Sequence, residues 1–261
     1  MEKFWGSPGP PSVLKWLRHW AWEPTCSECS LSLGEGKTPN ILFLRETKQT
    51  VEEMRWIQGE LHYDSMLAIP CLERRGGLAM LWKNEVDFHI QTYTQNHIDA
   101  LIMANQNSPW RIMGFYGKPE EQLRHETWLL LKHLKSRSSA PWLCIGDYNE
   151  ILASREKEGG RPKSLQLMNN FCNTLLHYDL VDLGYSGNIF TWNNSREGDA
   201  FVQLRLDRAC ATMEWKELFP RAWVSHLQAS YFDHVPILLT THPLSQKNRF
   251  KKSHVDLRRS G

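Results

Sequence analysis

Short runs of apolar residues alternate with a few amphipathic segments along most of this chain. Short apolar runs are typical of buried strands, whereas apolar residues three or four positions apart indicate helices. Strands are predicted at 41–44, 77–82, 86–92, 97–104, 110–116, 142–145, 190–192, 202–206 and 235–240. Helices are predicted at 51–61, 120–134 and 164–178. Many short strands with few helices between them predict an α/β fold of two packed sheets flanked by helices.

The first 38 residues depart from this pattern. A proline-rich stretch at 8–11 interrupts regular structure, and Ser12 is placed to cap a short helix over 13–22. Residues 25–37 are expected to form a loop, and no linker follows them. We therefore expect a divergent, poorly ordered segment at 1–38, one domain at 39–241 and a basic tail at 242–261.

The composition is that of an ordinary globular protein, with 41% hydrophobic and 23% charged residues. No apolar run is long enough for a transmembrane helix and no secretory pattern is seen, so no membrane partner is expected. The net charge of +2 gives no general basic field, so nucleic acid would have to bind at local patches. The six scattered cysteines suit a reducing compartment, and we expect a nuclear or cytoplasmic monomer.

Two local features lie near the ends of the chain. The tail is basic because it carries Lys247, Arg249, Lys251, Lys252, Arg258 and Arg259. Such a tail is either a disordered, solvated end or a contact for nucleic acid. Near the other end, Cys26 and Cys29 form an isolated CxxC pair, and no second pair completes a zinc site beside them.

Polar side chains stand at the ends of several predicted strands. They are Glu46, Tyr116, Asp147, Asn149 and Asp207, together with Asp233 and His234 just before the last strand. Strand ends are where a rigid scaffold presents side chains to a shared cleft. Each residue alone is more often a turn or cap residue, so the prediction depends on their order and context.

The chemistry of these residue types is specific. Carboxylates bind hard cations such as Mg²⁺ through oxygen, and such a cation neutralises charge that builds on a phosphoryl group. A histidine held by an aspartate transfers protons near neutral pH, and an amide and a phenol donate hydrogen bonds to phosphate oxygens. Together these groups predict metal-assisted hydrolysis of a phosphodiester.

Eight segments occur in an order that resembles a known family. They are PNILFLRETK, RRGGLAMLW, GFYG, WLCIGDYNEIL, EKEGGRP, LVDLGYSGNIFTWNN, VQLRLDRA and FDHVPILL, and they cover about residues 39–241. These segments resemble the endonuclease domain of plant LINE-type (non-LTR) retrotransposons, within the endonuclease/exonuclease/phosphatase superfamily. The resemblance implies a four-layer α/β sandwich, in which two mixed β-sheets pack face to face with helices outside.

The resemblance also assigns roles around the cation and the phosphate. Glu46 matches the metal-binding glutamate, and Tyr116 matches a tyrosine that contacts the phosphate. Asp147 and Asn149 match a pair that positions the attacking water and the scissile phosphate. The implied cofactor is Mg²⁺, with Mn²⁺ as a substitute, and the implied partner is DNA.

The remaining roles concern proton transfer. Asp207 matches the aspartate that orients the catalytic histidine, and His234 matches that histidine. Asp233 stands beside it and is expected to aid the metal site. The resemblance therefore implies a histidine that either bonds the phosphate or handles the proton.

The chain departs from the family pattern at two places. The family opens with a strand that ends in a WNCRG-like segment, whose asparagine helps to bind metal and phosphate, and nothing here matches it. The stretch GSPGPPSVLKWLR resembles the family segment that comes directly after that strand, so we expect the first strand to be missing. Phe232 replaces the usual serine, and its ring either packs harmlessly or crowds the phosphate.

Ancestry and activity are separate inferences. The first hypothesis is a Mg²⁺-dependent endonuclease that nicks DNA. The alternative is a catalytically inactive nucleic-acid-binding remnant of a retroelement, supported by the basic tail and the twelve tryptophans, although most of these tryptophans are expected in the core. A phosphatase of small molecules is less favoured, because LVDLGYSGNIFTWNN and EKEGGRP are retroelement-like.

Overall fold

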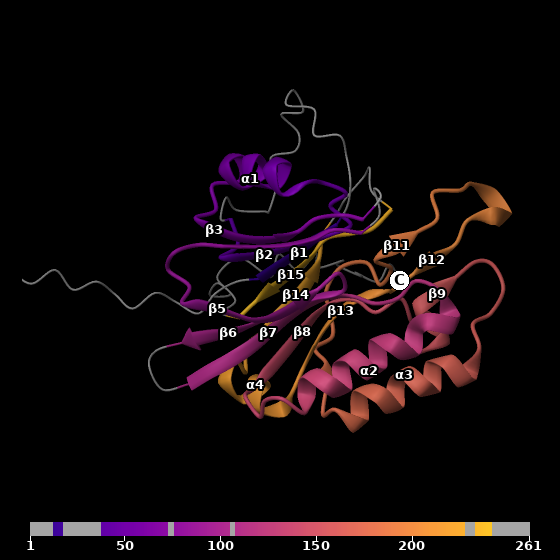
Figure 1. The fold of residues 1–261 in the computed structure, drawn as a ribbon. Coiled ribbons are helices and arrows are strands. Elements are labelled where there is room, and N and C mark those ends of the chain that lie inside the picture. The colour runs from indigo at the N-terminus through magenta and orange to yellow at the C-terminus, as the bar shows by residue number, and fades with distance from the viewer. Residues whose placement is uncertain (1–12, 18–37, 73–75, 105–107, 228–232, 242–261) are drawn as a thin grey trace, which may run out of the picture.

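The computed structural model describes residues 13–17, 38–72, 76–104, 108–227 and 233–241, which build two six-stranded sheets packed face to face (Figure 1). In the first sheet the strands follow the order β14 (Trp223–His226), β15 (Ile237–Thr240), β1 (Val13–Leu17), β2 (Ile41–Arg45), β4 (Leu78–Trp82) and β3 (Ser65–Ile69). In the second sheet the order is β10 (Val181–Asp182), β13 (Asp207–Ala211), β8 (Trp142–Asp147), β7 (Ser108–Tyr116), β6 (His97–Ala104) and β5 (Phe88–Thr94).

Both large sheets are mixed. In the first sheet β1 runs parallel to β2, and in the second sheet β7 runs parallel to β8. The other neighbouring strands in these sheets pair antiparallel. A small sheet of β11 (Trp192–Asn193), β12 (Gln203–Leu204) and β9 (Lys157–Glu158) adjoins them.

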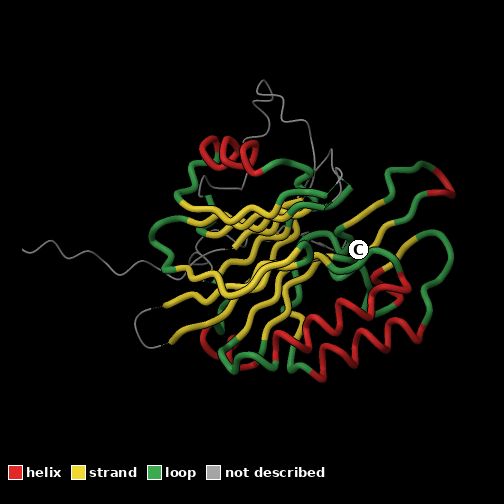
Figure 2. The backbone as a smooth tube through the Cα atoms, viewed as in Figure 1, coloured by secondary structure: helices red, strands yellow, loops and turns green. Residues whose placement is uncertain are grey.

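Helices cover the outer faces of the two large sheets, so that the molecule has four layers (Figure 2). Helix α1 (Val51–Glu60) lies over the first sheet, and α2 (Arg124–Lys135) and α3 (Leu165–His177) lie under the second. A short helix, α4 (Met213–Leu218), and 3₁₀ turns at Glu121–Leu123, Ser154–Glu156 and Gly198–Ala200 complete the described elements. The predicted α/β sandwich is therefore confirmed. No described helix has the length and apolar content needed to cross a membrane.

Helix α1 shows how local sequence sets an element boundary. The Thr50 hydroxyl accepts a hydrogen bond from the Glu53 backbone N–H, and the Glu53 carboxylate accepts one from the Thr50 N–H. This capping box satisfies two amide groups that the first helical turn would otherwise leave unpaired. The helix then buries Met54 against the outer face of the first sheet.

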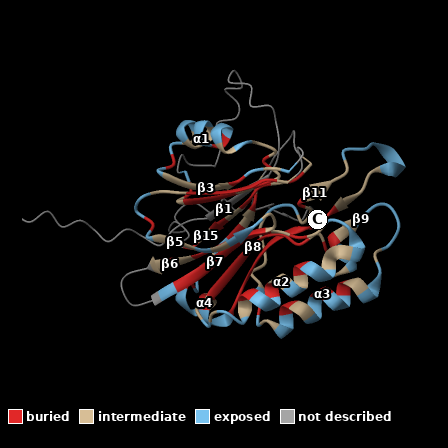
Figure 3. Cartoon of the chain, in the orientation of Figure 1, coloured by how far each residue is buried: buried red, intermediate tan, exposed pale blue. Residues whose placement is uncertain are grey.

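Strands alternate their side chains between an inner core and two outer clusters. The buried residues lie mainly along the strands of the two large sheets (Figure 3). On β2, Ile41 and Phe43 belong to the core that joins the two sheets, whereas Leu42 packs in the cluster under α1. On β8, Leu143 and Ile145 enter that same inner core. The inner core is therefore built from every second residue of facing strands.

Strand β1 corrects two expectations. The helix predicted over 13–22 is wrong for Val13–Leu17, which form a strand between β2 and β15, where a missing strand was expected. Pairing on both sides satisfies backbone groups that β2 and β15 would otherwise expose, and this outweighs the local helical pattern. Residues 18–22, the Cys26–Cys29 pair, Phe232 and the basic tail lie outside the described residues.

Glycine at position 114 sets the spacing of the two sheets at one point. A Cβ atom added to Gly114 on β7 would lie 2.4 Å from Cδ2 of Phe43 on β2. We expect Gly114→Ala to lower the free energy of unfolding by about 1–3 kcal/mol, because the core must shift to admit the methyl group. Urea unfolding followed by circular dichroism measures this.

The matched control is Gly59→Ala in α1, where an added Cβ meets no atom within 4 Å. This change is expected to leave the protein as stable or to stabilise it by up to about 1 kcal/mol, because alanine favours a helix. Equal losses of stability in the two variants would contradict the close packing of the sheets at Gly114.

Candidate active site

The inward-facing rows of the second sheet end in polar residues. Trp110 and Ile112 on β7 face the inner core, and Tyr116 is a later member of the same row. By the same alternation, Asp147 ends β8 and Asp207 begins β13 on the inward side. Tyr116 pairs with Asp147, and Asp147 pairs with Asp207, so the three residues stand side by side across three neighbouring strands.

The opposite sheet contributes Arg45. It ends β2 on the side of Ile41 and Phe43, and only 1% of its side chain is exposed. Its Nη2 lies 2.8 Å from Oδ2 of Asp147 and 3.8 Å from Oδ1 of Asp207. Burial alone would lower the pKa of Arg45, but Asp147 and Asp207, together with Tyr116 and Glu46, outweigh it and raise the pKa. Arg45 is therefore a permanent positive charge within the carboxylate group.

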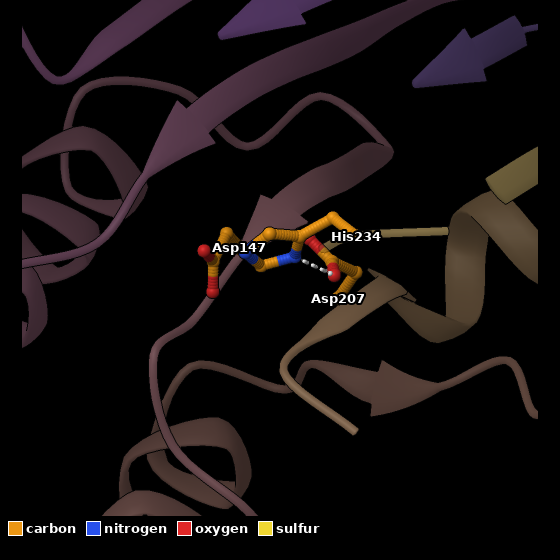
Figure 4. A group of neighbouring side chains, drawn as sticks. All are labelled: Asp147, Asp207 and His234. Carbon is orange, nitrogen blue, oxygen red and sulfur yellow. Dashed lines mark hydrogen bonds and ion pairs between the residues drawn. The ribbon is translucent and has the colours of Figure 1, made fainter. Parts of the chain in front are cut away.

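His234 completes the cluster from the segment before β15. Its Nδ1 lies 2.8 Å from Oδ2 of Asp207 (Figure 4), and its backbone forms an isolated bridge with Trp192 of β11. Nη2 of Arg45 lies 2.8 Å from Nε2 of His234 and 3.0 Å from Nδ1. Because an aspartate accepts and a guanidinium donates, we assign the proton to Nδ1, so that Nε2 accepts from Arg45.

Glu46 and Tyr116 form the more exposed side of the site. The Tyr116 hydroxyl donates a hydrogen bond to Oε1 of Glu46. The Arg45 Nη1 is 3.8 Å from that oxygen, and 20% of the Glu46 side chain is exposed. Glu46 has a φ of 48°, a left-handed conformation that only the surrounding structure can hold. Burial raises the pKa of Tyr116, so its phenol remains a donor at neutral pH.

Asn149 is tied to the cluster through Asp147. Its backbone N–H donates to Oδ1 of Asp147 at 2.8 Å, and its Nδ2 donates to the carbonyl of Gly117 at 2.7 Å. Its φ of 53° is one that asparagine adopts more readily than most residues. The geometry thus fixes the Asn149 amide beside the Asp147 carboxylate, and their joint role on one substrate group stays a prediction.

The donors suit a divalent cation. Ligand atoms of Asp147, Asp207 and His234 all lie within 4.8 Å of one another, and all three residues are buried. Carboxylate oxygens are the atoms that Mg²⁺ and Mn²⁺ prefer, so the donor set fits such an ion. Neither Glu46 nor Asp233 belongs to this group, and their assignment as metal ligands stays a prediction. The backbone carbonyl of Asp233 accepts a hydrogen bond from Asn193 at 2.8 Å.

Comparison with known proteins decides the family. The model of the endonuclease/exonuclease/phosphatase family matches residues 9–234. The chain belongs to this family. The family match begins at residue 9, whereas the resemblance seen in the sequence began at about residue 39. The match therefore includes β1. No curated protein sequence matches the chain.

Solved structures share the fold of this family member. The endonuclease domain of TRAS1, a telomere-specific non-LTR retrotransposon, is 15% identical, with a TM-score of 0.62 over 88% of this chain and 97% of that chain. The 3' phosphatase NExo from Neisseria, bound to product DNA hairpin, is 14% identical, with a TM-score of 0.64 over 88% and 99%. The AP endonuclease LMAP from Leishmania major is 13% identical, with a TM-score of 0.67 over 87% and 86%. Identities this low establish the fold alone.

Among the described residues of the cluster, Arg45 is the one that the sequence analysis did not predict. It stands in the segment RETK, but no role was assigned to it. The sequence does carry an indication of its position. Side chains alternate along β2, so Arg45 occupies the inward position two residues after Phe43, where a hydrophobic residue would extend the core. A charged residue at such a position must meet an opposite charge, and the facing sheet of this family fold supplies one.

A second charged cluster supports β13 from its outer side. Arg208 follows Asp207 and points the other way, where Nη1 is 2.9 Å from Oδ2 of Asp182 and Nη2 is 3.0 Å from Oε2 of Glu156. Arg205 also contacts Glu156 and Asp182, each at 2.8 Å. Burial opposes ionisation of Glu156, but Arg208, the Leu152 backbone N–H and Arg205 together outweigh it and lower its pKa. Burial also opposes ionisation of Asp182, and its contacts with Arg208, Arg205 and the Gly184 backbone N–H together outweigh burial and lower its pKa.

These pKa shifts predict a loss of stability in acid. The folded pKa values of Glu156 and Asp182 lie below their ordinary 4.5 and 3.8, so their stabilisation is complete above those values. It is lost as the pH falls through the lower folded values. We expect Glu156→Gln to cost about 3 kcal/mol at pH 7 and to flatten the decline of unfolding free energy below about pH 4.5.

Guanidinium unfolding between pH 7 and pH 3 measures this effect. Glu52→Gln, at an exposed position of α1, is the control and should follow the unmodified protein. An acid profile of Glu156→Gln that parallels the unmodified protein would show that the pair with Arg208 adds no pH-dependent stability.

Proposed function

We propose that this family member is a metal-dependent phosphodiesterase that nicks DNA, acting as a monomer in the nucleus. The observation that carries the proposal is the buried His234–Asp207 pair, which lies directly beside Asp147 at the polar end of the inner core. A proton-handling pair next to a carboxylate cluster suits hydrolysis of a phosphoryl group. The support for DNA comes from neighbours of the same fold, which include a retrotransposon endonuclease domain and a phosphatase bound to a DNA hairpin.

In the proposed reaction, His234 handles the proton. Asp207 holds the Nδ1 proton at 2.8 Å, which leaves Nε2 as the atom that exchanges a proton with water or with the leaving oxygen. The Asp207 carboxylate also stabilises the imidazolium that forms when Nε2 takes that proton. Arg45 now donates to Nε2, so this hydrogen bond must break before Nε2 can act as a base.

The other residues of the site orient water and phosphate. Asp147 accepts a hydrogen bond from the water, and its neighbour Asn149, fixed by Gly117, presents an amide next to it. Tyr116 donates a hydrogen bond toward the open side, where a phosphate oxygen can replace Glu46 as its acceptor. Asp147 and Asp207, with Glu46 at the rim, would hold Mg²⁺ or Mn²⁺, which would supply positive charge against the developing charge of the phosphate.

An inactive nucleic-acid-binding remnant is the second candidate function. The observation that favours it is Arg45, because this guanidinium contacts both Asp147 and the Nε2 atom that the reaction needs. Binding that persists in EDTA and weakens steeply with salt, without any nicking, would identify this second function. A phosphatase of small molecules would be identified by faster turnover of an inositol phosphate than of plasmid DNA.

The test is nicking of supercoiled plasmid in the presence of Mg²⁺ or Mn²⁺. We expect nicking that EDTA abolishes and that His234→Ala slows by at least about 100-fold, the usual share of general acid–base catalysis. Asp207→Asn should also slow it, because the neutral amide stabilises the imidazolium less and its NH2 group can donate to Nδ1, which favours the other tautomer.

The matched control is His89→Ala on β5, where the histidine side chain is 54% exposed. Strand β5 is the edge strand of the second sheet, and β6 separates it from the strands that carry the site. It should nick at the rate of the unmodified protein. Equal rates for His234→Ala and the unmodified protein would assign the nicking to a contaminant or to another site, and no nicking at any metal concentration would reject the proposed enzyme.

A further inference from the structure

Arg45 occupies the middle of the donor set of the candidate active site. Its Nη2 is 2.8 Å from Oδ2 of Asp147, 2.8 Å from Nε2 of His234 and 3.8 Å from Oδ1 of Asp207. Those three residues are the ones whose ligand atoms lie within 4.8 Å of one another. A guanidinium nitrogen therefore stands where the donors converge, and a cation that used the same atoms would need that place.

The hydrogen-bonding environment of Arg45 differs from that of Arg208, an arginine that supports β13 from its outer side. The hydrogen bonds of Arg45 to His234 and its ion pair with Asp147 use Nη2, and Nη1 lies 3.8 Å from Oε1 of Glu46. Arg208 uses both terminal nitrogens, on two carboxylates and on the carbonyls of Glu150 and Arg205. Arg45 is held by charge more than by a matched set of acceptors.

The carboxylates around Arg45 could also bind a divalent cation, which would compete with the guanidinium for them. Among the residues that the structure describes, the Arg45 guanidinium contacts or faces three carboxylates, those of Asp147, Asp207 and Glu46. A divalent cation would neutralise these carboxylates more completely than a monovalent group does. The exchange of one cation for the other is therefore a competition for the same negative groups.

We propose that Arg45 is an internal counter-cation that occupies the divalent-cation site and weakens metal binding by competing for Asp147 and Asp207. The inference rests on the proposed function only in taking this cluster as the cation site. It predicts a chain that binds Mn²⁺ or Mg²⁺ weakly as it stands, and more tightly once the guanidinium is removed.

The experiment measures binding of Mn²⁺ to the full chain without DNA, from the electron paramagnetic resonance signal of free Mn²⁺. We expect Arg45→Gln, which removes the charge, to bind one Mn²⁺ at least about tenfold more tightly than the unmodified protein. Mn²⁺ should also raise the melting temperature of this variant by more than that of the unmodified protein. Arg45→Met, which keeps the chain length without charge, is the second variant and covers a failure of Arg45→Gln to fold.

Two controls locate the effect. Arg111→Gln removes another buried guanidinium, whose Nε is 2.7 Å from Oδ1 of Asp99, and should leave Mn²⁺ affinity unchanged. Adding Asp147→Asn to Arg45→Gln should abolish the gain, because it removes an oxygen of the cluster.

Three outcomes would overturn the inference. They are Mn²⁺ binding by the unmodified protein as tight as that of the uncharged variants, a gain that survives Asp147→Asn, and an equal gain in Arg111→Gln. These outcomes are independent of nicking, since no DNA is present. A gain in Mn²⁺ affinity without any nicking would reject the proposed enzyme while supporting the role of Arg45.

Discussion

The structure depends on two sheets that share one inner face. Their strands alternate side chains, so every second residue of β2, β7, β8 and β13 enters the same core. The site is the place where these inward rows change from hydrocarbon to polar groups, at Arg45 on one sheet and at Tyr116, Asp147 and Asp207 on the other. A slip of one residue in any of these strands would turn its polar group to the opposite face. The hydrophobic packing therefore fixes the register that the chemistry requires.

This arrangement explains how much of the fold could be predicted from the sequence. Short, mainly apolar runs such as 110–116 and 142–145 were correctly predicted as parts of β7 and β8, because a strand buried on both faces has few polar residues. Strand β3 was missed because its residues Ser65–Ile69 are mostly half-buried and carry no clear alternation. Strand β13 was missed because it combines Asp207 and Arg208 with small residues, and only tertiary charge pairs make burial of those two groups favourable.

The sequence predicted the residues of the candidate site other than Arg45, but not the contacts between them. Tyr116, Asp147 and Asp207 follow or begin strands, and the family resemblance supplied their order, but neither source specifies which groups touch. Contact depends on the opposite sheet, whose strand β2 is distant in the sequence. The hydrogen bond from Tyr116 to Glu46 and the contacts of Arg45 are properties of that packing. The inward position of Arg45 on its strand could be predicted from the sequence, but its role depends on which carboxylates of the other sheet face it.

Arg45 also changes where the question of activity lies. The sequence located the weakness in a missing asparagine, whereas the structure places a guanidinium on both a carboxylate of the cluster and the Nε2 atom of His234. One movement of this side chain would free both groups together, so in the proposed reaction release of the carboxylate and release of the base are coupled. A phosphate oxygen is an acceptor for which a guanidinium has a strong preference. In the proposed reaction, a phosphodiester that enters beside Tyr116 and Glu46 therefore offers Arg45 an alternative partner, and the guanidinium that now contacts Asp147 and His234 would then bind the substrate.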